Sequence, residues 1–145
     1  MADNEADNEL RGSCLCGTIT YLVRGGIGRI SHCHCSMCRK AHGAAFGTYA
    51  PVAWKGFEIL TGEDSLRRYR SSDHVTRTFC GECGSTLQYI PDGRSGFGLA
   101  IGTLDDDPKR RPEFQIWAGD KAPWWELSDD PPYFDTVPPR REEGA

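Results

Sequence analysis

Three cysteines within six residues, in a C-x-C-x-x-C pattern, constrain this chain more than any other feature. They are Cys33, Cys35 and Cys38, the central triplet. In an extended segment residues i and i+2 point to the same side, so the first two thiols can face one point in space. A C-x-x-C turn then brings the third thiol to that point, a spacing found in thiolate zinc sites. Three thiols cannot all pair as disulfides, so the triplet predicts a metal site that lacks a fourth protein thiol.

Four further cysteines form two outer pairs, Cys14 with Cys16 and Cys80 with Cys83. The economical partition joins these pairs into one closed tetrahedral site and leaves the central triplet as an open one. Closed zinc sites are structural, whereas a site with three protein ligands keeps a position for water or substrate. The sequence therefore predicts two zinc ions per chain, one structural on the outer pairs and one catalytic on the triplet.

Other uses of the seven thiols stay open at this point. One zinc can take four of them and leave the rest as buried free thiols. A histidine, His32, His34 or His42, can close the central site, although strand alternation points His34 away from the neighbouring thiols. A redox role for Cys80 and Cys83 is the weaker interpretation, since a glycine-flanked C-x-x-C in a β context is more typical of metal binding.

Composition predicts a mostly β fold of antiparallel sheets with few or no helices. The 145 residues include 17 glycines and 9 prolines, with 38% hydrophobic residues, which suits short strands and many turns. We expect one zinc-binding domain over residues 10–135, between a disordered acidic tail at 1–9 and a disordered tail at 136–145. Strands are predicted over 18–23, 45–50, 57–60, 65–69, 74–79, 86–90, 96–101 and 113–117. Residues 39–42 are predicted as a single helical turn or a loop, and Pro51 as the end of a strand.

Charge and hydropathy argue against nucleic acid and membranes as partners. The net charge of −4 argues against a nucleic-acid-binding protein, which needs a clustered basic surface. The acidic N-terminus is unlike a signal peptide, and no apolar run reaches the roughly 18 residues of a membrane helix. We therefore expect a cytoplasmic protein without a membrane partner, in a reducing compartment where thiols are metal ligands or catalytic groups rather than disulfides.

Four segments together resemble the glutathione-dependent formaldehyde-activating enzyme family, which includes centromere protein V. They are G-S-C-L-C-G at 12–17, C-H-C-S-M-C-R-K at 33–40, F-C-G-E-C-G-S at 79–85 and K-A-P-W at 121–124. The resemblance covers residues 11–135 and implies a β-tent fold stapled by zinc. It also implies the zinc partition given above. One departure is visible, because members often carry a histidine in the strand before K-A-P-W, where this chain reads F-Q-I-W at 114–117.

The activity that the resemblance implies is a carbon–sulfur lyase type of reaction, run toward synthesis. Glutathione or another small thiol would join an aldehyde, as in the formation of S-hydroxymethylglutathione from formaldehyde. Arg39 and Lys40 can offset the charge of the thiolates or hold a substrate carboxylate, or they can be solvated surface charges. The same alternatives apply to Lys121. Trp124 and Trp125 can line the site or belong to the core. The rival hypothesis is a zinc-stabilised β module that binds a protein and catalyses nothing.

Overall fold

The computed structural model describes residues 9–139. The chain forms two compact units, and each combines two stretches of sequence. Of the described residues, the first unit contains 9–30 and 48–111, and the second contains 31–47 and 112–139. Each unit carries one of the predicted groups of thiols, so the two groups are described separately below.

The predicted domain boundaries stay predictions. The tail at 1–9 lies outside the described residues except for Glu9, and the tail at 136–145 is described only to residue 139. Among the described residues no helix is long and apolar enough to cross a membrane.

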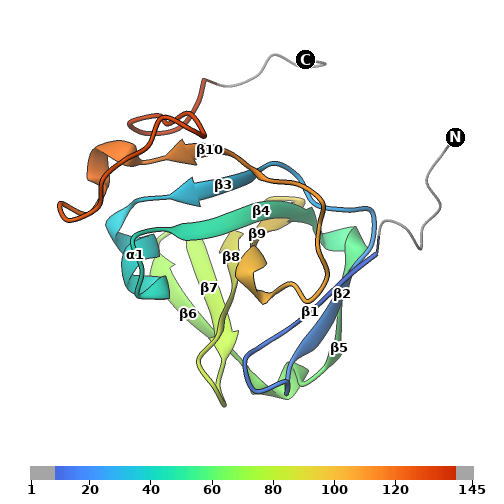
Figure 1. Ribbon diagram of the computed structural model, residues 1–145. Coiled ribbons are helices and arrows are strands. Elements are labelled where there is room, and N and C mark those ends of the chain that lie inside the picture. Colours follow the sequence, from blue (N-terminus) through green and yellow to red (C-terminus); the bar gives the residue numbers. More distant parts are fainter. Residues whose placement is uncertain (1–8, 140–145) are drawn as a thin grey trace, which may run out of the picture. The chain divides into compact units, whose positions relative to one another are not determined.

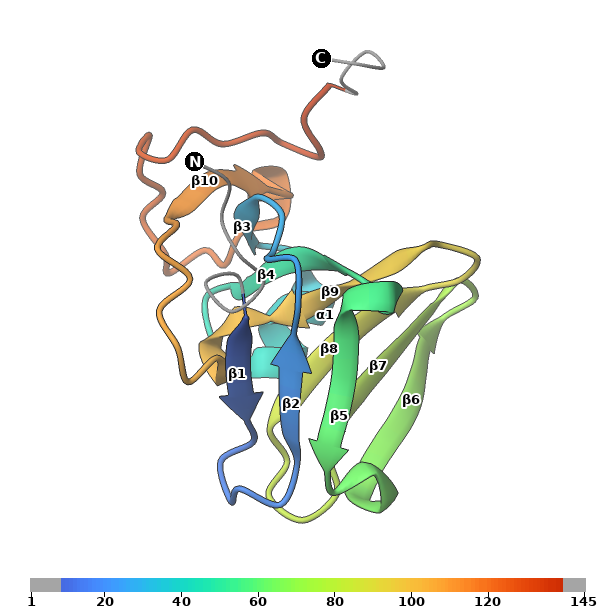
Figure 2. The ribbon, with the colours of Figure 1, turned by 90° about the vertical axis from the view of Figure 1, so that its right-hand side faces the viewer.

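The first unit begins with a three-stranded antiparallel sheet. Its strands are β1 (Leu10–Ser13), β2 (Thr20–Val23) and β5 (Phe57–Thr61), in the order β1-β2-β5 (Figure 2). β-branched and aromatic side chains favour this pleated, half-buried conformation. The loop between β1 and β2 carries the first pair of cysteines, so the sheet holds that pair at its end.

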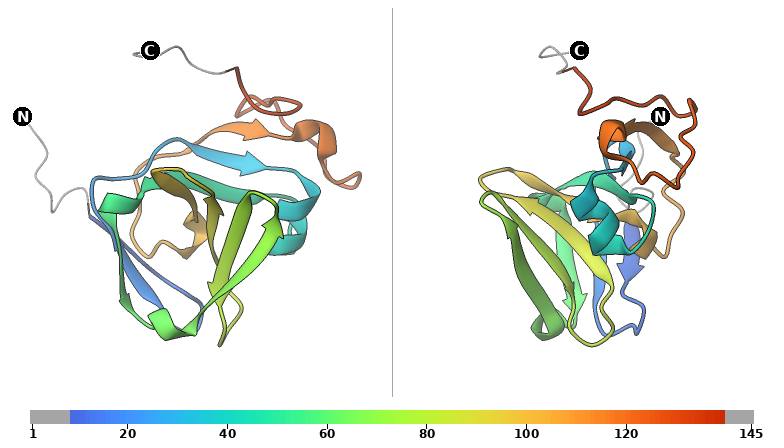
Figure 3. Two further views of the ribbon diagram at one scale, coloured as in Figure 1. Left: turned by 180° about the vertical axis from the view of Figure 1, so that it is seen from behind. Right: turned by 90° about the vertical axis from the view of Figure 1, so that its left-hand side faces the viewer.

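The first unit also contains five neighbouring antiparallel strands, drawn from green to yellow in Figure 3 (left), and their order is β4-β9-β8-β7-β6. Their bounds are β4 (Gly47–Ala53), β6 (Leu66–Ser72), β7 (Val75–Cys80), β8 (Thr86–Pro91) and β9 (Gly96–Ala100). Short 3-10 helices occur at Trp54–Gly56, Glu63–Ser65 and Ile101–Thr103. Of the last pair of cysteines, Cys80 ends β7 and Cys83 lies in the turn between β7 and β8.

The hydrophobic core of the first unit lies between these two sheets (Figures 1 and 2). Tyr21 and Val23 of β2 pack there with Phe97 and Leu99 of β9, and all four are almost fully buried. The alternation of buried and exposed side chains along the strands supplies one apolar face to each sheet. Cys14 and Cys80 belong to the same core, so the first unit buries part of its own thiol group.

Pro51 does not end a strand, in contrast to the prediction. It lies inside β4, opposite Gly98 of β9. Its carbonyl oxygen accepts the Gly28 N–H at 2.8 Å, so this residue's backbone groups point away from β9. An N–H group at this position would also point away from β9. Proline therefore removes no hydrogen bond between β4 and β9, and the strand continues to Ala53.

The second unit contains β3 (Ile30–Cys33, of which Ile30 belongs to the first unit), α1 (Ser36–His42) and β10 (Pro112–Ile116), with β10 beside β3. A 3-10 helix follows at Ala118–Asp120. The helix begins three residues before the predicted turn, because the Cys35 sulfur caps it by accepting the Cys38 N–H. It ends at Gly43 in a left-handed conformation. With one α-helix among the described residues, the prediction of a mostly β fold with few helices is confirmed.

Candidate metal centres

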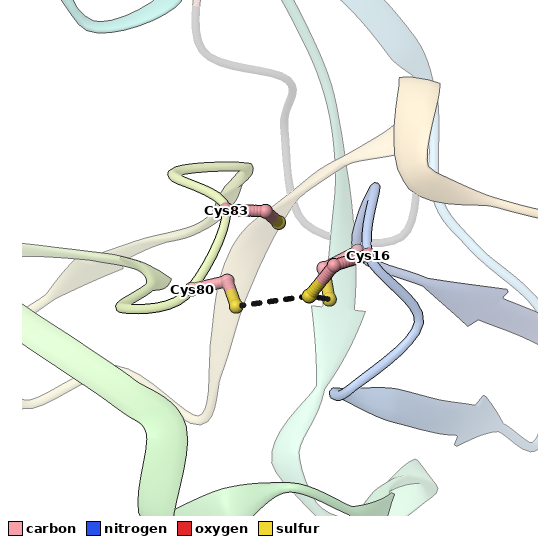
Figure 4. Close-up of side chains that lie close together, drawn as sticks. Cys16, Cys80 and Cys83 are labelled. Atoms are coloured by element: carbon pink, nitrogen blue, oxygen red, sulfur yellow. Dashed lines mark hydrogen bonds between the residues drawn. The ribbon is translucent and has the colours of Figure 1, made fainter.

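The four outer thiols meet in the first unit, and we call them the four-thiol cluster (Cys14, Cys16, Cys80 and Cys83). Their sulfur atoms all lie within 4.8 Å of one another. Figure 4 shows Cys16, Cys80 and Cys83 turned toward one another, from the loop after β1 and from the turn after β7. The fold thus brings together two pairs of thiols that are more than sixty residues apart in the sequence.

The spacing of these sulfurs fits a tetrahedral zinc ion. A zinc–sulfur bond of about 2.3 Å gives tetrahedral sulfur–sulfur edges of about 3.8 Å. The sulfur of Cys16 lies 3.6 Å from that of Cys14 and 3.9 Å from that of Cys80. Four soft donors at this spacing form the donor set that zinc prefers in closed sites.

Backbone N–H groups and a hydroxyl group form hydrogen bonds with sulfurs of the four-thiol cluster. The Ile19 N–H donates to the Cys14 sulfur at 3.3 Å, and the Glu82 N–H donates to the Cys80 sulfur at 3.4 Å. The Ser85 hydroxyl, 3.3 Å from the Cys83 sulfur, lowers the pKa of Cys83 to about 5. Burial acts in the opposite direction and raises the pKa of Cys80 to about 11.

Ser85 also joins the two halves of this cluster. Its hydroxyl oxygen accepts the Leu15 N–H at 2.8 Å. Leu15 stands between the two thiols of the N-terminal pair, so this bond fixes the first loop against the later turn. Within that turn the Gly84 N–H donates to the Cys80 carbonyl at 2.8 Å.

The central triplet meets in the second unit, and we call it the three-thiol cluster (Cys33, Cys35 and Cys38). Its three sulfurs all lie within 4.8 Å of one another. Cys33 ends β3, Cys35 caps α1, and Cys38 lies in the first turn of that helix. Cys33 and Cys38 are buried, whereas Cys35 is half-buried. The cluster therefore offers three soft donors and leaves one tetrahedral position for another ligand.

Hydrogen bonds among the three thiols of this cluster favour the thiolate form of Cys35. Hydrogen bonds from Cys33 and then Cys38 lower the pKa of Cys35 to about 2. The hydrogen bonds of Cys33 with Cys35 and Cys38 raise the pKa of Cys33, and burial of its side chain raises that pKa further. The Cys38 N–H, 3.3 Å from the Cys35 sulfur, further stabilises negative charge on that sulfur.

No histidine joins either group of thiols within residues 9–139. His34 is fully buried and is directed toward Gln115, with its Nε2 atom 2.8 Å from the Gln115 Oε1 atom. The ring of His32 lies tilted against that of Phe46, with 4.1 Å between their centroids. Burial, together with the nearby His34, lowers the pKa of His32 to about 4, so its imidazole is neutral near pH 7.

Arg39 fixes the backbone around the three-thiol cluster. Its Nε atom donates to the carbonyl of His34 at 3.2 Å, and its Nη2 atom donates to the carbonyl of Asp120 at 3.1 Å. The Asp120 carboxylate in turn accepts the Ser36 N–H at 2.8 Å. The sequence suggested that Arg39 offsets the thiolate charge, holds a substrate carboxylate or is solvated, and the structure adds a role that was not considered, which is to connect two backbone carbonyls.

Aromatic residues lie beside the same loop. Phe46 contacts Trp125 at 5.6 Å and His34 at 5.2 Å between ring centroids. Trp124 is 69% exposed and Trp125 37% exposed, so neither is a core residue. Lys121 donates to the Trp125 carbonyl at 2.9 Å and thereby fixes this segment, whereas Lys40 on α1 is exposed.

The sequence interpretation missed Gln115 and Asp120 as neighbours of the three-thiol cluster. Asp120 carries no local signal, because its partner Ser36 is 84 residues away. For Gln115 a signal existed in the departure noted above, since it lies in the segment where relatives often carry a histidine. That difference drew attention to the position of Gln115, but it gave no sign that Gln115 contacts His34.

Comparisons with known proteins found similarity in sequence and in fold. An uncharacterized lyase of Schizosaccharomyces pombe is 28% identical over 81 residues, which are 56% of this chain and 57% of that relative. The chain thus spans little more than half the length of this relative. A crystal structure of a Rhodobacter sphaeroides protein has a TM-score of 0.54 at 21% identity, over 67% of this chain and 89% of that chain. That likeness shows a shared fold.

The family comparison covers most of the chain. The match to the family described as glutathione-dependent formaldehyde-activating enzyme spans residues 9–120. This range contains all seven cysteines of the two clusters. The protein therefore belongs to the glutathione-dependent formaldehyde-activating enzyme family.

Proposed function

We propose that this protein is a zinc-dependent carbon–sulfur lyase-type enzyme that acts on adducts of glutathione or another small thiol. The formation of S-hydroxymethylglutathione from formaldehyde is the reaction we favour. The observation that carries the proposal is the three-thiol cluster, which supplies three of the four ligands that zinc requires. Membership of the family and the lyase-named relative support the same reaction class.

The two clusters take different roles in this proposal. The four-thiol cluster holds a structural zinc, because its four donors leave no position for a substrate. The three-thiol cluster holds a catalytic zinc through Cys33, Cys35 and Cys38. Two zinc ions per chain are expected, in a cytoplasm where the thiols stay reduced.

The open position is suited to a thiol substrate. Cys33, Cys35 and Cys38 would hold a zinc ion there, and it would supply a lowered pKa to a bound substrate thiol and polarisation to an aldehyde oxygen. The reaction forms one carbon–sulfur bond, and the thiol proton passes to the aldehyde oxygen, so no oxidant or reductant is consumed. The chain contributes the direction of its three sulfurs and the Cys38 N–H that stabilises negative charge at Cys35.

Two surface features can hold the substrate. Arg39 and Lys121 are engaged with backbone carbonyls, whereas Lys40 is exposed two residues after Cys38. We assign Lys40 to a carboxylate of the thiol substrate, since an ammonium group is a point charge that needs no fixed geometry. Trp125, beside Phe46, supplies an apolar wall against which the substrate chain can pack.

Metal content and thiol binding test the proposal in sequence. Elemental mass spectrometry of protein purified without chelators or added thiols should find two zinc ions per chain. After cobalt substitution, glutathione should change the visible spectrum of the wild type and leave that of Cys38→Ser unchanged. Formaldehyde should then be consumed with glutathione faster than in the uncatalysed reaction. A full metal content with no response to glutathione or to other small thiols would favour the protein-binding β module.

A further inference from the structure

Gln115 is a buried polar side chain that contacts His34, in the loop that carries the three-thiol cluster. It lies on β10 and is 4% exposed. Its Nε2 atom donates to the carbonyls of Ser128 at 3.0 Å and Pro131 at 2.9 Å. Its Oε1 atom lies 2.8 Å from the Nε2 atom of His34. The amide group of Gln115 thus connects β10 with the segment at 128–131 and with the His34 side chain.

These contacts determine the tautomer of His34. Two carbonyl oxygens can accept only from the amide nitrogen of Gln115, so its amide oxygen must face the histidine. An amide oxygen only accepts, and therefore the His34 Nε2 atom carries the hydrogen and donates it. The His34 Nδ1 atom is buried and has no hydrogen-bond partner among the described residues. Gln115 is the side-chain partner that holds this ring in place.

His34 stands between the first two thiols of the cluster, so its position limits theirs. Its N–H donates to the Ile116 carbonyl at 3.0 Å, and its carbonyl accepts from Arg39. Burial and the edge contact with Phe46 hold the imidazole ring by packing, and the hydrogen bond to Gln115 adds the directional contact that fixes its Nε2 atom. A ring fixed on one side of an extended segment keeps Cys33 and Cys35 on the opposite side.

We propose that Gln115 is a positioning residue of the three-thiol cluster, which acts through His34 and ties the thiol loop to the segment at 128–131. The inference rests on the proposed function only in assuming that the cluster binds zinc. Residues that orient metal ligands from the next layer outward typically change metal affinity by about 10–100-fold when they are replaced. We expect a loss of this size for the three-thiol cluster and none for the four-thiol cluster.

Chelator competition on the full chain tests this expectation. Gln115→Leu keeps the side-chain bulk and removes all three hydrogen bonds. The affinity of the three-thiol cluster for zinc should be at least about ten times lower in this variant than in the wild type. The affinity of the four-thiol cluster serves as a reference within the same molecule. Glu126→Gln, at an exposed position of the same unit, is the matched control and should behave as the wild type. Equal zinc retention by Gln115→Leu and the wild type would overturn the inference and leave the proposed enzyme activity untouched.

The tautomer supplies a second test, which holds even if Gln115→Leu fails to fold. Nitrogen-15 NMR of the wild-type protein should show one histidine ring with a hydrogen locked on Nε2. Single replacements of His32, His42 and His74 by Asn assign that signal by elimination. A His34 ring that carries its hydrogen on Nδ1, or that averages both tautomers, would contradict the role of Gln115.

Discussion

The four-thiol cluster and the three-thiol cluster present similar donors in opposite topological settings. Two sulfurs of the first cluster that lie 3.9 Å apart belong to residues 64 positions apart, whereas all thiols of the second lie within six residues. Closing a long loop removes more entropy from the unfolded chain than closing a short one. A metal ion in the four-thiol cluster should therefore stabilise the first unit, whereas one in the three-thiol cluster adds little to stability and is available for chemistry.

Replacing one buried thiol from each cluster tests this difference directly. Cys14 and Cys38 are both 3% exposed, so Cys14→Ser and Cys38→Ser remove sulfurs of equal burial. Cys14→Ser should lower the free energy of unfolding by more than about 4 kcal/mol, as expected when a structural metal is lost. Cys38→Ser should cost about 1 kcal/mol and remove one zinc. Urea unfolding and metal analysis check both values, and equal destabilisation would refute the separate roles.

Stepwise metal removal examines the same difference without a mutation. A chelator should take the zinc of the three-thiol cluster first, with no change in far-ultraviolet circular dichroism. The second zinc should leave much more slowly, by at least about 100-fold, and its loss should unfold the strands of the first unit. If both ions leave in one phase together with the secondary structure, the three-thiol cluster is as structural as the other.

Two glycines extend the comparison to the backbone of each unit. Gly62 and Gly43 both have positive φ angles, but a Cβ atom at Gly62 would overlap the carbonyl oxygen of Thr18, whereas one at Gly43 would meet open space. Gly62→Ala should therefore destabilise the protein by about 3 kcal/mol or more, from backbone strain and forced movement together. Gly43→Ala should cost only about 1 kcal/mol. Thermal unfolding of the zinc-loaded proteins measures both, and similar losses would contradict the packing at Gly62.

Lys40 provides the mildest test, which concerns only the open site. Lys40→Ala should raise the KM for glutathione about two- to five-fold and leave kcat unchanged, because an exposed charge contributes modestly and equally to substrate and transition state. Lys55→Ala, at an exposed lysine of the first unit, is the matched control. A KM that stays the same in Lys40→Ala would remove this residue from the substrate site.

Local sequence patterns predicted several elements well. The strand predicted at 57–60 is β5 (Phe57–Thr61), and the one predicted at 86–90 is β8 (Thr86–Pro91). Both are short apolar or β-branched runs between turn residues, a signal that depends on near neighbours only. The helix was placed too late, because its cap is a cysteine, which is not among the usual capping residues.

The spacing of the cysteines predicted the two outer pairs and the triplet, because C-x-C and C-x-x-C turns bring their own thiols together whatever the rest of the chain does. That the two outer pairs join each other was inferred from the number of thiols, and the fold brings them together. Contacts between distant residues were beyond the sequence. Gln115 and His34 are 81 positions apart, and each belongs to an ordinary local pattern. Their contact exists only because β10 lies beside β3, and that pairing depends on the packing of the whole second unit.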